Sequence, residues 1–272
     1  MIDDIKKQLL SIFDDCREFT GSRILDDARD VFLPHTKTLN QMATLDVDDR
    51  LVDALIADSS LKPAIEKISR LKQIHGLRLE RQRARTIIES DAPWDMLKGF
   101  IYYPNYLGLA EMESCGAGLK AGDRVVFLGS GPVPLSLITL VKRCGIRGVG
   151  IEKDTVNADL SRRVLETLAL GGEIEIIQGD HFMLPLSSPC SLIMVGADAV
   201  PKEEIFTHLA GALPNGMKLS YRIYEKGLRR LFDRDHVGGL PSGLREYRRI
   251  RPQPPVNNTS VFVTKEKDHD QR

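Results

Sequence analysis

The stretch DRVVFLGSGPVPLSLITL, residues 123–140, passes from one regular pattern to another through a glycine-rich turn. An apolar, β-branched run at 125–128 comes first, and apolar residues at helical spacing begin after Pro134. This order predicts a strand, a tight turn and a helix. The turn consists of Gly129, Ser130, Gly131 and Pro132. Glycines let the backbone approach a ligand closely, and the free N–H groups of a helix can face a ribose or a carboxylate, so we expect this turn to bind a cofactor.

The chain after this turn alternates short apolar runs with helical patterns. Predicted strands lie at 147–152, 173–178, 191–196 and 217–224, and predicted helices at 155–168 and 202–213. Strands that alternate with helices form a parallel sheet, and ligands bind beyond the carboxyl ends of its strands. The last two predicted strands, 244–251 and 259–265, are joined by a link too short for a helix, which predicts an antiparallel pair. Such a pair at the end of a parallel sheet is typical of the class I methyltransferase fold, a Rossmann-type α/β fold, rather than of a dinucleotide dehydrogenase.

The first part of the chain has a helical composition. No glycine occurs from residue 22 to residue 75, and apolar residues recur there at three- and four-residue spacing. We expect a long helix to end near Glu89, and a break at Pro104 to free Asn105 and Tyr106 from a regular helix face. We predict three segments, namely an N-terminal helical cap domain at 1–118, a Rossmann-type domain at 119–266 and a disordered tail at 267–272.

The charge balance and the cysteines exclude several classes of protein. With 38 basic and 38 acidic residues the chain has no net charge, so no overall field attracts nucleic acid or an anionic membrane. No segment resembles a secretion signal or the roughly 18 apolar residues of a membrane helix, so we expect a cytoplasmic protein. The four cysteines are widely spaced, and we expect no protein-bound metal. The basic stretch from Lys226 to Arg251 is interpreted as solvated surface, and a homodimer is left open.

Polar residues follow the predicted strands at the expected ligand-binding edge. Glu152 ends the second strand, where a carboxylate can accept hydrogen bonds from both hydroxyls of a ribose. Asp180 follows the third strand and can accept from an adenine amino group, with His181 beside it, and Ala197 after the fourth strand leaves room for a nucleoside. Pro134 stands where the dinucleotide fingerprint has its third glycine, which argues against a pyrophosphate. We therefore predict that the ligand is S-adenosylmethionine (SAM).

Four stretches together resemble the nicotianamine synthase family. They are LERQRARTIIESDAPW (79–94), FIYYPNYLGL (100–109), VVFLGSGPVPLSLI (125–138) and PPVNNTSVFV (254–263). The resemblance spans about residues 65–265 and is greatest to the archaeal nicotianamine-synthase-like enzymes. Bacterial staphylopine- and pseudopaline-type synthases share the glycine turn and the first stretch, but they match less well at the second and fourth.

The resemblance implies a reaction and two catalytic residues. Enzymes of this family transfer the 3-amino-3-carboxypropyl group of SAM to an amine and release 5′-methylthioadenosine (MTA). The family glutamate that accepts the amine proton matches Glu80, and the tyrosine that orients the amine matches Tyr106. Without the resemblance, Glu80 would be interpreted as a salt-bridge partner of a neighbouring arginine and Tyr106 as a core residue. The helical cap would cover the carboxyl ends of the sheet and exclude water.

The candidate substrate residues lie in the matched stretches and beyond the fifth predicted strand. They are Tyr103, Asn105, Arg222, Tyr224, Arg229 and Asn258. The two arginines and Tyr224 can bind a substrate carboxylate. We predict an aminocarboxypropyltransferase whose acceptor is glutamate, another amino acid or a second SAM, and whose product is a nicotianamine-like metal chelator. The alternatives are a single transfer to histidine, cyclisation of SAM to azetidine-2-carboxylate, ordinary methyl transfer, and SAM binding without turnover.

Overall fold

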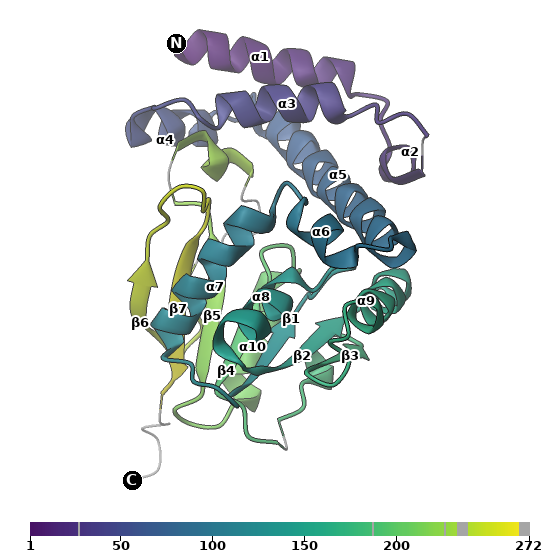
Figure 1. Ribbon diagram of the computed structural model, residues 1–272. Helices are drawn as coiled ribbons and strands as arrows, with labels where there is room; N and C mark the ends of the chain where they lie inside the picture. Colours follow the sequence, from purple (N-terminus) through teal and green to yellow (C-terminus); the bar gives the residue numbers. More distant parts are fainter. Residues whose placement is uncertain (27, 187, 226, 233–238, 267–272) are drawn as a thin grey trace. The chain divides into compact units, whose positions relative to one another are not determined.

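The computed structural model describes residues 1–26, 28–186, 188–225, 227–232 and 239–266 (Figure 1). The predicted tail at 267–272 and Lys226, at the start of the basic stretch, lie outside the described residues. The chain forms two compact units. The helical unit comprises Met1–Leu79 and Tyr224–Arg234, and the sheet unit comprises Glu80–Ile223 and Asp235–Arg272. Among the described residues, no helix combines the length and the apolar character needed to cross a membrane.

The helical unit is built from amphipathic helices and one distant segment. Its helices are α1 (Ile2–Asp15), α2 (Gly21–Asp26), α3 (Leu33–Met42), α4 (Asp49–Ala57), the first part of α5 (Lys62–Glu89) and the 3-10 helix η2 (Gly227–Phe232). Asp48 starts α4, because its side chain accepts a hydrogen bond from the backbone N–H of Arg50. The buried core of this unit contains side chains of η2 together with those of α1, α3, α4 and α5. The expected end of the long helix at Glu89 is confirmed.

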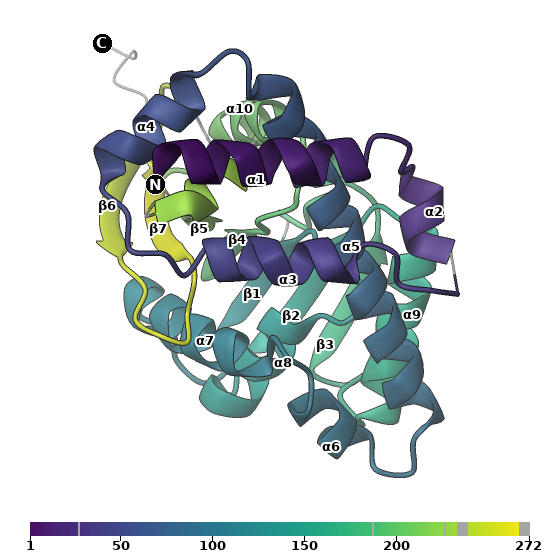
Figure 2. The ribbon, with the colours of Figure 1, turned by 90° about the horizontal axis from the view of Figure 1, so that it is seen from above.

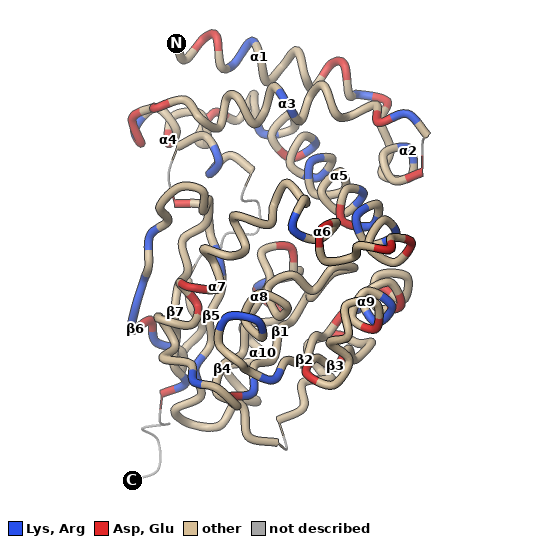
Figure 3. The backbone as a smooth tube through the Cα atoms, viewed as in Figure 1, with Lys and Arg blue, Asp and Glu red and all other residues tan. Residues whose placement is uncertain are grey.

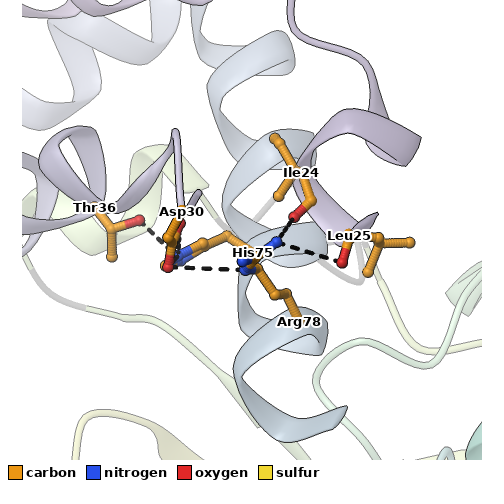
Figure 4. A network of polar contacts seen from close by, with 6 residues as sticks. All are labelled: Ile24, Leu25, Asp30, Thr36, His75 and Arg78. Carbon is orange, nitrogen blue, oxygen red and sulfur yellow. Dashed lines mark hydrogen bonds and ion pairs between the residues drawn. The ribbon is translucent and has the colours of Figure 1, made fainter. Parts of the chain in front are cut away.

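A buried polar network joins α5 to α3 and to the chain before it (Figure 4). Nε2 of His75 lies 2.9 Å from both carboxylate oxygens of Asp30, and Nδ1 lies 3.0 Å from Oγ1 of Thr36. Nη1 of Arg78 donates to the backbone oxygen of Ile24 at 2.7 Å. Since His75 and Arg78 are three residues apart, they lie on one face of α5. This face therefore holds the connection between α2 and α3 in place.

The sheet unit contains seven strands in the order β3-β2-β1-β4-β5-β7-β6. In Figure 2 the order runs from β6 on the left to β3 on the right. The strands are β1 (Arg124–Leu128), β2 (Arg147–Glu152), β3 (Ile174–Gln178), β4 (Leu192–Val195), β5 (Lys218–Ile223), β6 (Leu244–Ile250) and β7 (Thr259–Lys265). The first five strands are parallel, and β7 pairs antiparallel with both β5 and β6. This topology confirms the predicted class I methyltransferase fold.

The helices of the sheet unit are α6 (Pro93–Lys98), α7 (Tyr103–Ala117), α8 (Leu135–Cys144), α9 (Thr155–Thr167), the 3-10 helix η1 (His181–Met183) and α10 (Lys202–Ala212). The helices α8, α9 and α10 follow strands as the alternating pattern predicted, and α6, α7 and η1 complete the set. A glycine sets the distance between α7 and β7, because a Cβ atom at Gly116 would lie 1.9 Å from the ring of Phe262. The absence of a side chain at this position therefore lets α7 pack directly on β7.

Two expectations for the region before β1 differ from the structure. Pro104 lies in the first turn of α7, so Asn105 and Tyr106 belong to a regular helix rather than to a break. A proline is tolerated there because the N–H groups of a first turn have no partner within the helix. The compact units divide after Leu79 rather than near residue 118, because α7 packs on α8 and β7 and belongs to the sheet unit.

Candidate active site

The glycine turn connects β1 to α8 and keeps its backbone accessible. Gly129 and Gly131 have φ angles of +79° and +71°, a left-handed conformation that favours glycine. The N–H of Gly129 donates to the backbone oxygen of Ile151 at 2.8 Å, which attaches the turn to β2. The side chain of Ser130 is buried and faces Gly150, where a Cβ atom would lie 2.8 Å from Oγ of Ser130. Pro132 is buried as well, so the two glycines supply the open part of the turn.

Glu152, at the end of β2, is held against this turn by two backbone hydrogen bonds. Its Oε2 accepts from the N–H of Gly131 and its Oε1 from the N–H of Asp154, both at 2.9 Å. The side chain is 93% buried as a consequence of this position. A carboxylate oxygen that accepts one hydrogen bond can accept another, so the orientation is compatible with the predicted binding of ribose hydroxyls.

The segment after β3 combines a carboxylate with exposed apolar side chains. Oδ1 of Asp180 accepts from the N–H of Phe182 at 3.0 Å, which starts η1. Phe182 and Met183 are 60% and 55% exposed, although both are apolar. His181 is buried instead, with its ring centroid 4.1 Å from that of Phe182 and its Nε2 3.5 Å from a carboxylate oxygen of Glu204. The exposed pair is thus available for an adenine ring, and His181 packs behind it.

The carboxyl group of Glu80 lies over the glycine turn. A Cβ atom at Gly131 would lie 3.0 Å from Oε2 of Glu80. Burial is the largest cause that raises the pKa of Glu80, from 4.5 to about 8, and the negative charges of Asp198 and Glu152 raise it further. The raised pKa favours the protonated form of this carboxyl group near neutral pH in the protein without substrate.

The arginines that surround Glu80 in the sequence bind other partners. Figure 3 shows basic and acidic residues along the whole of α5. Arg81 donates to Oδ1 of Asn157 at 2.8 Å and to Oδ1 of Asp154 at 3.1 Å, and Arg83 donates to the backbone oxygen of Met96 at 2.8 Å. Among the residues that the structure describes, no basic side chain forms an ion pair with Glu80. The structure therefore does not support the interpretation of Glu80 as a salt-bridge partner of a neighbouring arginine.

Asp198 is a residue of this site that the sequence interpretation missed. It follows β4 and is exposed, and its charge is the largest electrostatic influence on the pKa of Glu80. Lys202, at the start of α10, donates from Nζ to the backbone oxygen of Ala197 and so holds the segment that carries Asp198. The signal was available, since an acidic residue beyond a strand end is the same feature that marked Glu152.

Tyr106, in the first turn of α7, lies against a buried guanidinium group. The Cζ atom of Arg222 lies 5.7 Å from the ring centroid of Tyr106 and 5.8 Å from that of Phe127. Nε of Arg222 donates to Oε1 of Glu113 at 3.3 Å. The structure therefore brings the predicted residues Tyr106 and Arg222 together, and it adds Glu113, a second residue that the sequence interpretation missed.

The predicted substrate residues from the second and fourth matched stretches also lie in the sheet unit. Oδ1 of Asn105 accepts from the backbone N–H of Asn257 at 3.0 Å, which connects α7 to the loop before β7. Asn258 is 94% buried, and its Nδ2 has no hydrogen-bond partner among the described residues. Tyr103 is partly exposed at the start of α7. Asn105 thus has a structural contact of its own, whereas Asn258 retains an unused donor.

Two of the six predicted substrate residues lie in the helical unit. Nη1 of Arg229 donates to the backbone oxygen of Ala43 at 3.1 Å, and the ring centroid of Tyr224 lies 6.0 Å from Nζ of Lys72. The chain leaves the sheet after Ile223 and joins the other unit at Tyr224. Tyr224 and Arg229 therefore belong to the helical unit, whereas Arg222 belongs to the sheet unit. Neither unit by itself contains all three residues. In the described ranges of the chain, no three acidic, histidine or cysteine side chains are grouped as metal ligands would be.

Comparisons with known proteins identify the family of this chain. A family model described as nicotianamine synthase protein matches residues 4–160. The structure of a glutamate-to-glutamine mutant of MtNAS, an archaeal nicotianamine-synthase-like protein, in complex with SAM has a TM-score of 0.82 and 27% identity, and covers 96% of this chain and 98% of that chain. The structure of MtNAS in complex with MTA and tNA has a TM-score of 0.82 and 28% identity, and covers 97% of each chain.

A curated relative matches over a shorter range. L-histidine 2-aminobutanoyltransferase of Yersinia pestis is 26% identical over 117 residues, and the match covers 43% of this chain and 43% of the relative. The matched family model covers more than half of the present chain, from the first helices through the glycine turn to α9. The chain therefore belongs to the nicotianamine synthase family.

Proposed function

We propose that this protein transfers the 3-amino-3-carboxypropyl group of SAM to an amine and releases MTA. The observation that carries the proposal is Glu80, a carboxyl group without an ion-pair partner among the described residues, which lies 3.0 Å from the position of a Cβ atom at Gly131. The complexes of MtNAS with SAM and with MTA and tNA support the same assignment of substrate and by-product.

The adenosine part of SAM is assigned to the carboxyl ends of β1 to β4. Glu152 accepts from the ribose hydroxyls, and the carboxylate of Asp180 accepts from the adenine amino group. The exposed rings and chains of Phe182 and Met183 cover the adenine, and the segment at Ala197 borders the nucleoside. Gly129 and Gly131 let the backbone approach the ribose and the methionyl part closely.

The transfer step balances without a further reactant. The lone pair of a neutral amine attacks Cγ of the methionyl group, and the bond between Cγ and sulfur breaks. The electron pair of that bond stays on sulfur, which turns the cationic sulfonium into the neutral thioether of MTA. The amine nitrogen loses its extra proton to the carboxylate of Glu80. A carboxyl group with a pKa of about 8 is well matched to an amine, because the base then has an affinity for protons close to that of the group it deprotonates.

The positive charge of the substrate favours the ionised form of Glu80. Both the sulfonium and the α-ammonium group of SAM are cations, and a nearby cation lowers the pKa of a carboxyl group. SAM binding therefore increases the fraction of Glu80 that is in the basic form. Tyr106 is assigned to orient the attacking amine, whose N–H donates to the phenol oxygen while the lone pair on nitrogen stays free to attack, and Tyr103, Arg222 and Asn258 are assigned to the substrate.

The proposed acceptor is an amino acid, and the identity of this acceptor distinguishes repeated transfer from a single transfer to histidine. We infer repeated transfer that starts from glutamate, another amino acid or a second SAM, and a nicotianamine-like chelating product. A single transfer to histidine is the second candidate, and the name of the Yersinia pestis relative favours it.

The test is to incubate the protein with SAM alone, with SAM and glutamate, and with SAM and histidine, and to analyse each product by mass spectrometry. Addition of two or more aminocarboxypropyl units supports the first candidate. One unit on histidine selects the second, and azetidine-2-carboxylate from SAM alone selects cyclisation. A methylated amino acid would refute all three.

A further inference from the structure

A buried ion pair lies on the side of Tyr106 that faces the sheet. Glu113 and Arg222 are 0% and 6% exposed, and Nε of Arg222 lies 3.3 Å from Oε1 of Glu113. Oγ of Ser260 lies at the same distance from this carboxylate oxygen. Arg222 and Ser260 are directly opposite each other in the pairing of β5 with β7, so the sheet presents both side chains to α7.

Glu113 and Tyr106 share one face of α7. They are seven residues apart, which corresponds to two turns of helix, and both contact the same guanidinium group. Arg222 lies between two rings, 5.7 Å from the centroid of Tyr106 and 5.8 Å from that of Phe127. Its planar group is therefore oriented by aromatic contacts and by the bond to Glu113 together.

Stability alone gives little reason for a charged pair at this place. A buried ion pair is often no more stabilising than apolar side chains of similar volume, because both charges must leave water. Oε2 of Glu113 is buried and has no hydrogen-bond partner within the described part of the chain. The cluster thus keeps polar groups in the core next to Tyr106, the residue that the proposed reaction uses to orient the amine.

We propose that Glu113 is a positioning residue for the transfer reaction, which holds the guanidinium of Arg222 against the ring of Tyr106. This proposal rests on the proposed function of Tyr106. The hydrogen bond to Glu113 restricts the guanidinium of Arg222 to one orientation. The guanidinium in turn holds the ring of Tyr106 in place. Misplacement of the ring by a small distance lowers the rate strongly, because the amine must be aligned with Cγ. Glu113 therefore acts on turnover without touching SAM or the acceptor.

The kinetic test compares Glu113→Gln with Glu111→Gln. Glu111 lies on the same helix, but it is exposed and pairs with Arg143 at 3.0 Å on the surface. We expect Glu113→Gln to lower kcat for MTA release at least about tenfold while KM and the calorimetric Kd for SAM stay within about twofold. Glu111→Gln should match the wild type. An unchanged kcat for Glu113→Gln, or weaker SAM binding in proportion to the loss of kcat, would overturn the proposal.

A second measurement follows Tyr106 directly and needs no turnover. The ionisation of its phenol is obtained from the near-ultraviolet absorbance of each protein after subtraction of a matched Tyr106→Phe protein. Glu113→Gln leaves the guanidinium charge uncompensated, which favours the phenolate and lowers the pKa of Tyr106. Arg222→Gln removes the cation and should raise this pKa. Shifts in opposite directions support the coupling, whereas shifts in the same direction indicate only loosened packing and would overturn it.

The two measurements separate this proposal from the proposed function. If the wild type releases no MTA, the proposed function fails, and the titration of Tyr106 still tests the contact with the ion pair. If Glu113→Gln does not fold, Arg222→Lys takes its place, because lysine keeps the charge but lacks the planar group that reaches Glu113 and both rings. We then expect the same loss of kcat with unchanged SAM binding. A higher KM for the acceptor at an unchanged kcat would instead show that Arg222 acts on substrate binding alone and would contradict the positioning role.

Discussion

Replacement of Glu80 by glutamine should make the protein more stable at high pH and much slower as a catalyst. The folded protein holds the proton of Glu80 up to a pKa of about 8, whereas an unfolded chain releases it near 4.5. The folded state therefore binds more protons than the unfolded state between these two values, and the free energy of unfolding falls as the pH rises through them. The stability that protonated Glu80 contributes is fully present below pH 4.5 and is lost by about pH 8.

The size of this effect follows from the same two values. A tenfold change in proton affinity corresponds to about 1.4 kcal/mol, so a rise of the pKa from 4.5 to about 8 corresponds to at most about 5 kcal/mol. Glutamine carries no charge at any pH, so the Glu80→Gln variant should not lose this stability. We expect the difference in unfolding free energy between the variant and the wild type to increase by roughly 2–4 kcal/mol from pH 5 to pH 9.

The assay is denaturant unfolding of both proteins without substrate at several pH values between 5 and 9. The control is Glu89→Gln at the end of α5, where the replaced side chain is exposed. The difference in unfolding free energy between this control and the wild type should stay constant with pH.

A kinetic assay tests the same group. The kcat/KM for MTA release by the wild type should rise with pH toward about 8, because only the ionised carboxylate accepts a proton. The Glu80→Gln variant should lose this rise and at least about tenfold in kcat, with SAM binding nearly unchanged. A stability difference that does not change with pH would refute the buried environment of Glu80, and unchanged turnover would refute its role as the base.

Two further substitutions test the cofactor site. Asp180→Ala should weaken SAM binding at least about tenfold in a calorimetric titration, because a carboxylate acceptor for the adenine amino group is lost, and a wild-type Kd would remove Asp180 from the adenine site. Gly131→Ala would add a Cβ atom 3.0 Å from Oε2 of Glu80 at a φ of +71°, so we expect lower unfolding free energy by about 1 kcal/mol and slower MTA release. Wild-type values for both quantities would show that the turn does not need a glycine at this position.

The fold could be predicted because its pattern is local. A β-branched run that ends in glycines predicted β1 and its turn, and the same alternation predicted the later strands close to their observed bounds. The site residues at strand ends followed from the topology, since Glu152 ends β2 and Asp180 lies two residues after the end of β3. Asp198 obeys the same rule, and it was missed because the interpretation of the fourth strand stopped at Ala197.

The remaining errors concern tertiary contacts that the sequence does not carry. Glu113 is one glutamate in a helix, and such residues are normally exposed, so nothing local indicated its burial beside Arg222. Tyr224 follows Arg222 by two positions, but the chain changes from the sheet unit to the helical unit between them. The helical composition of residues 80–118 likewise could not reveal that α7 packs on β7.

The nucleoside by-product of the reaction reveals which bond of SAM breaks. The purified protein is incubated with SAM and the amino-acid acceptors, and the nucleoside by-products are separated by chromatography. Attack at Cγ leaves the methyl group on sulfur, so we predict MTA in an amount equal to the aminocarboxypropyl groups transferred. Attack at the methyl group would leave S-adenosylhomocysteine, and the appearance of this compound without MTA would refute transfer of the aminocarboxypropyl group.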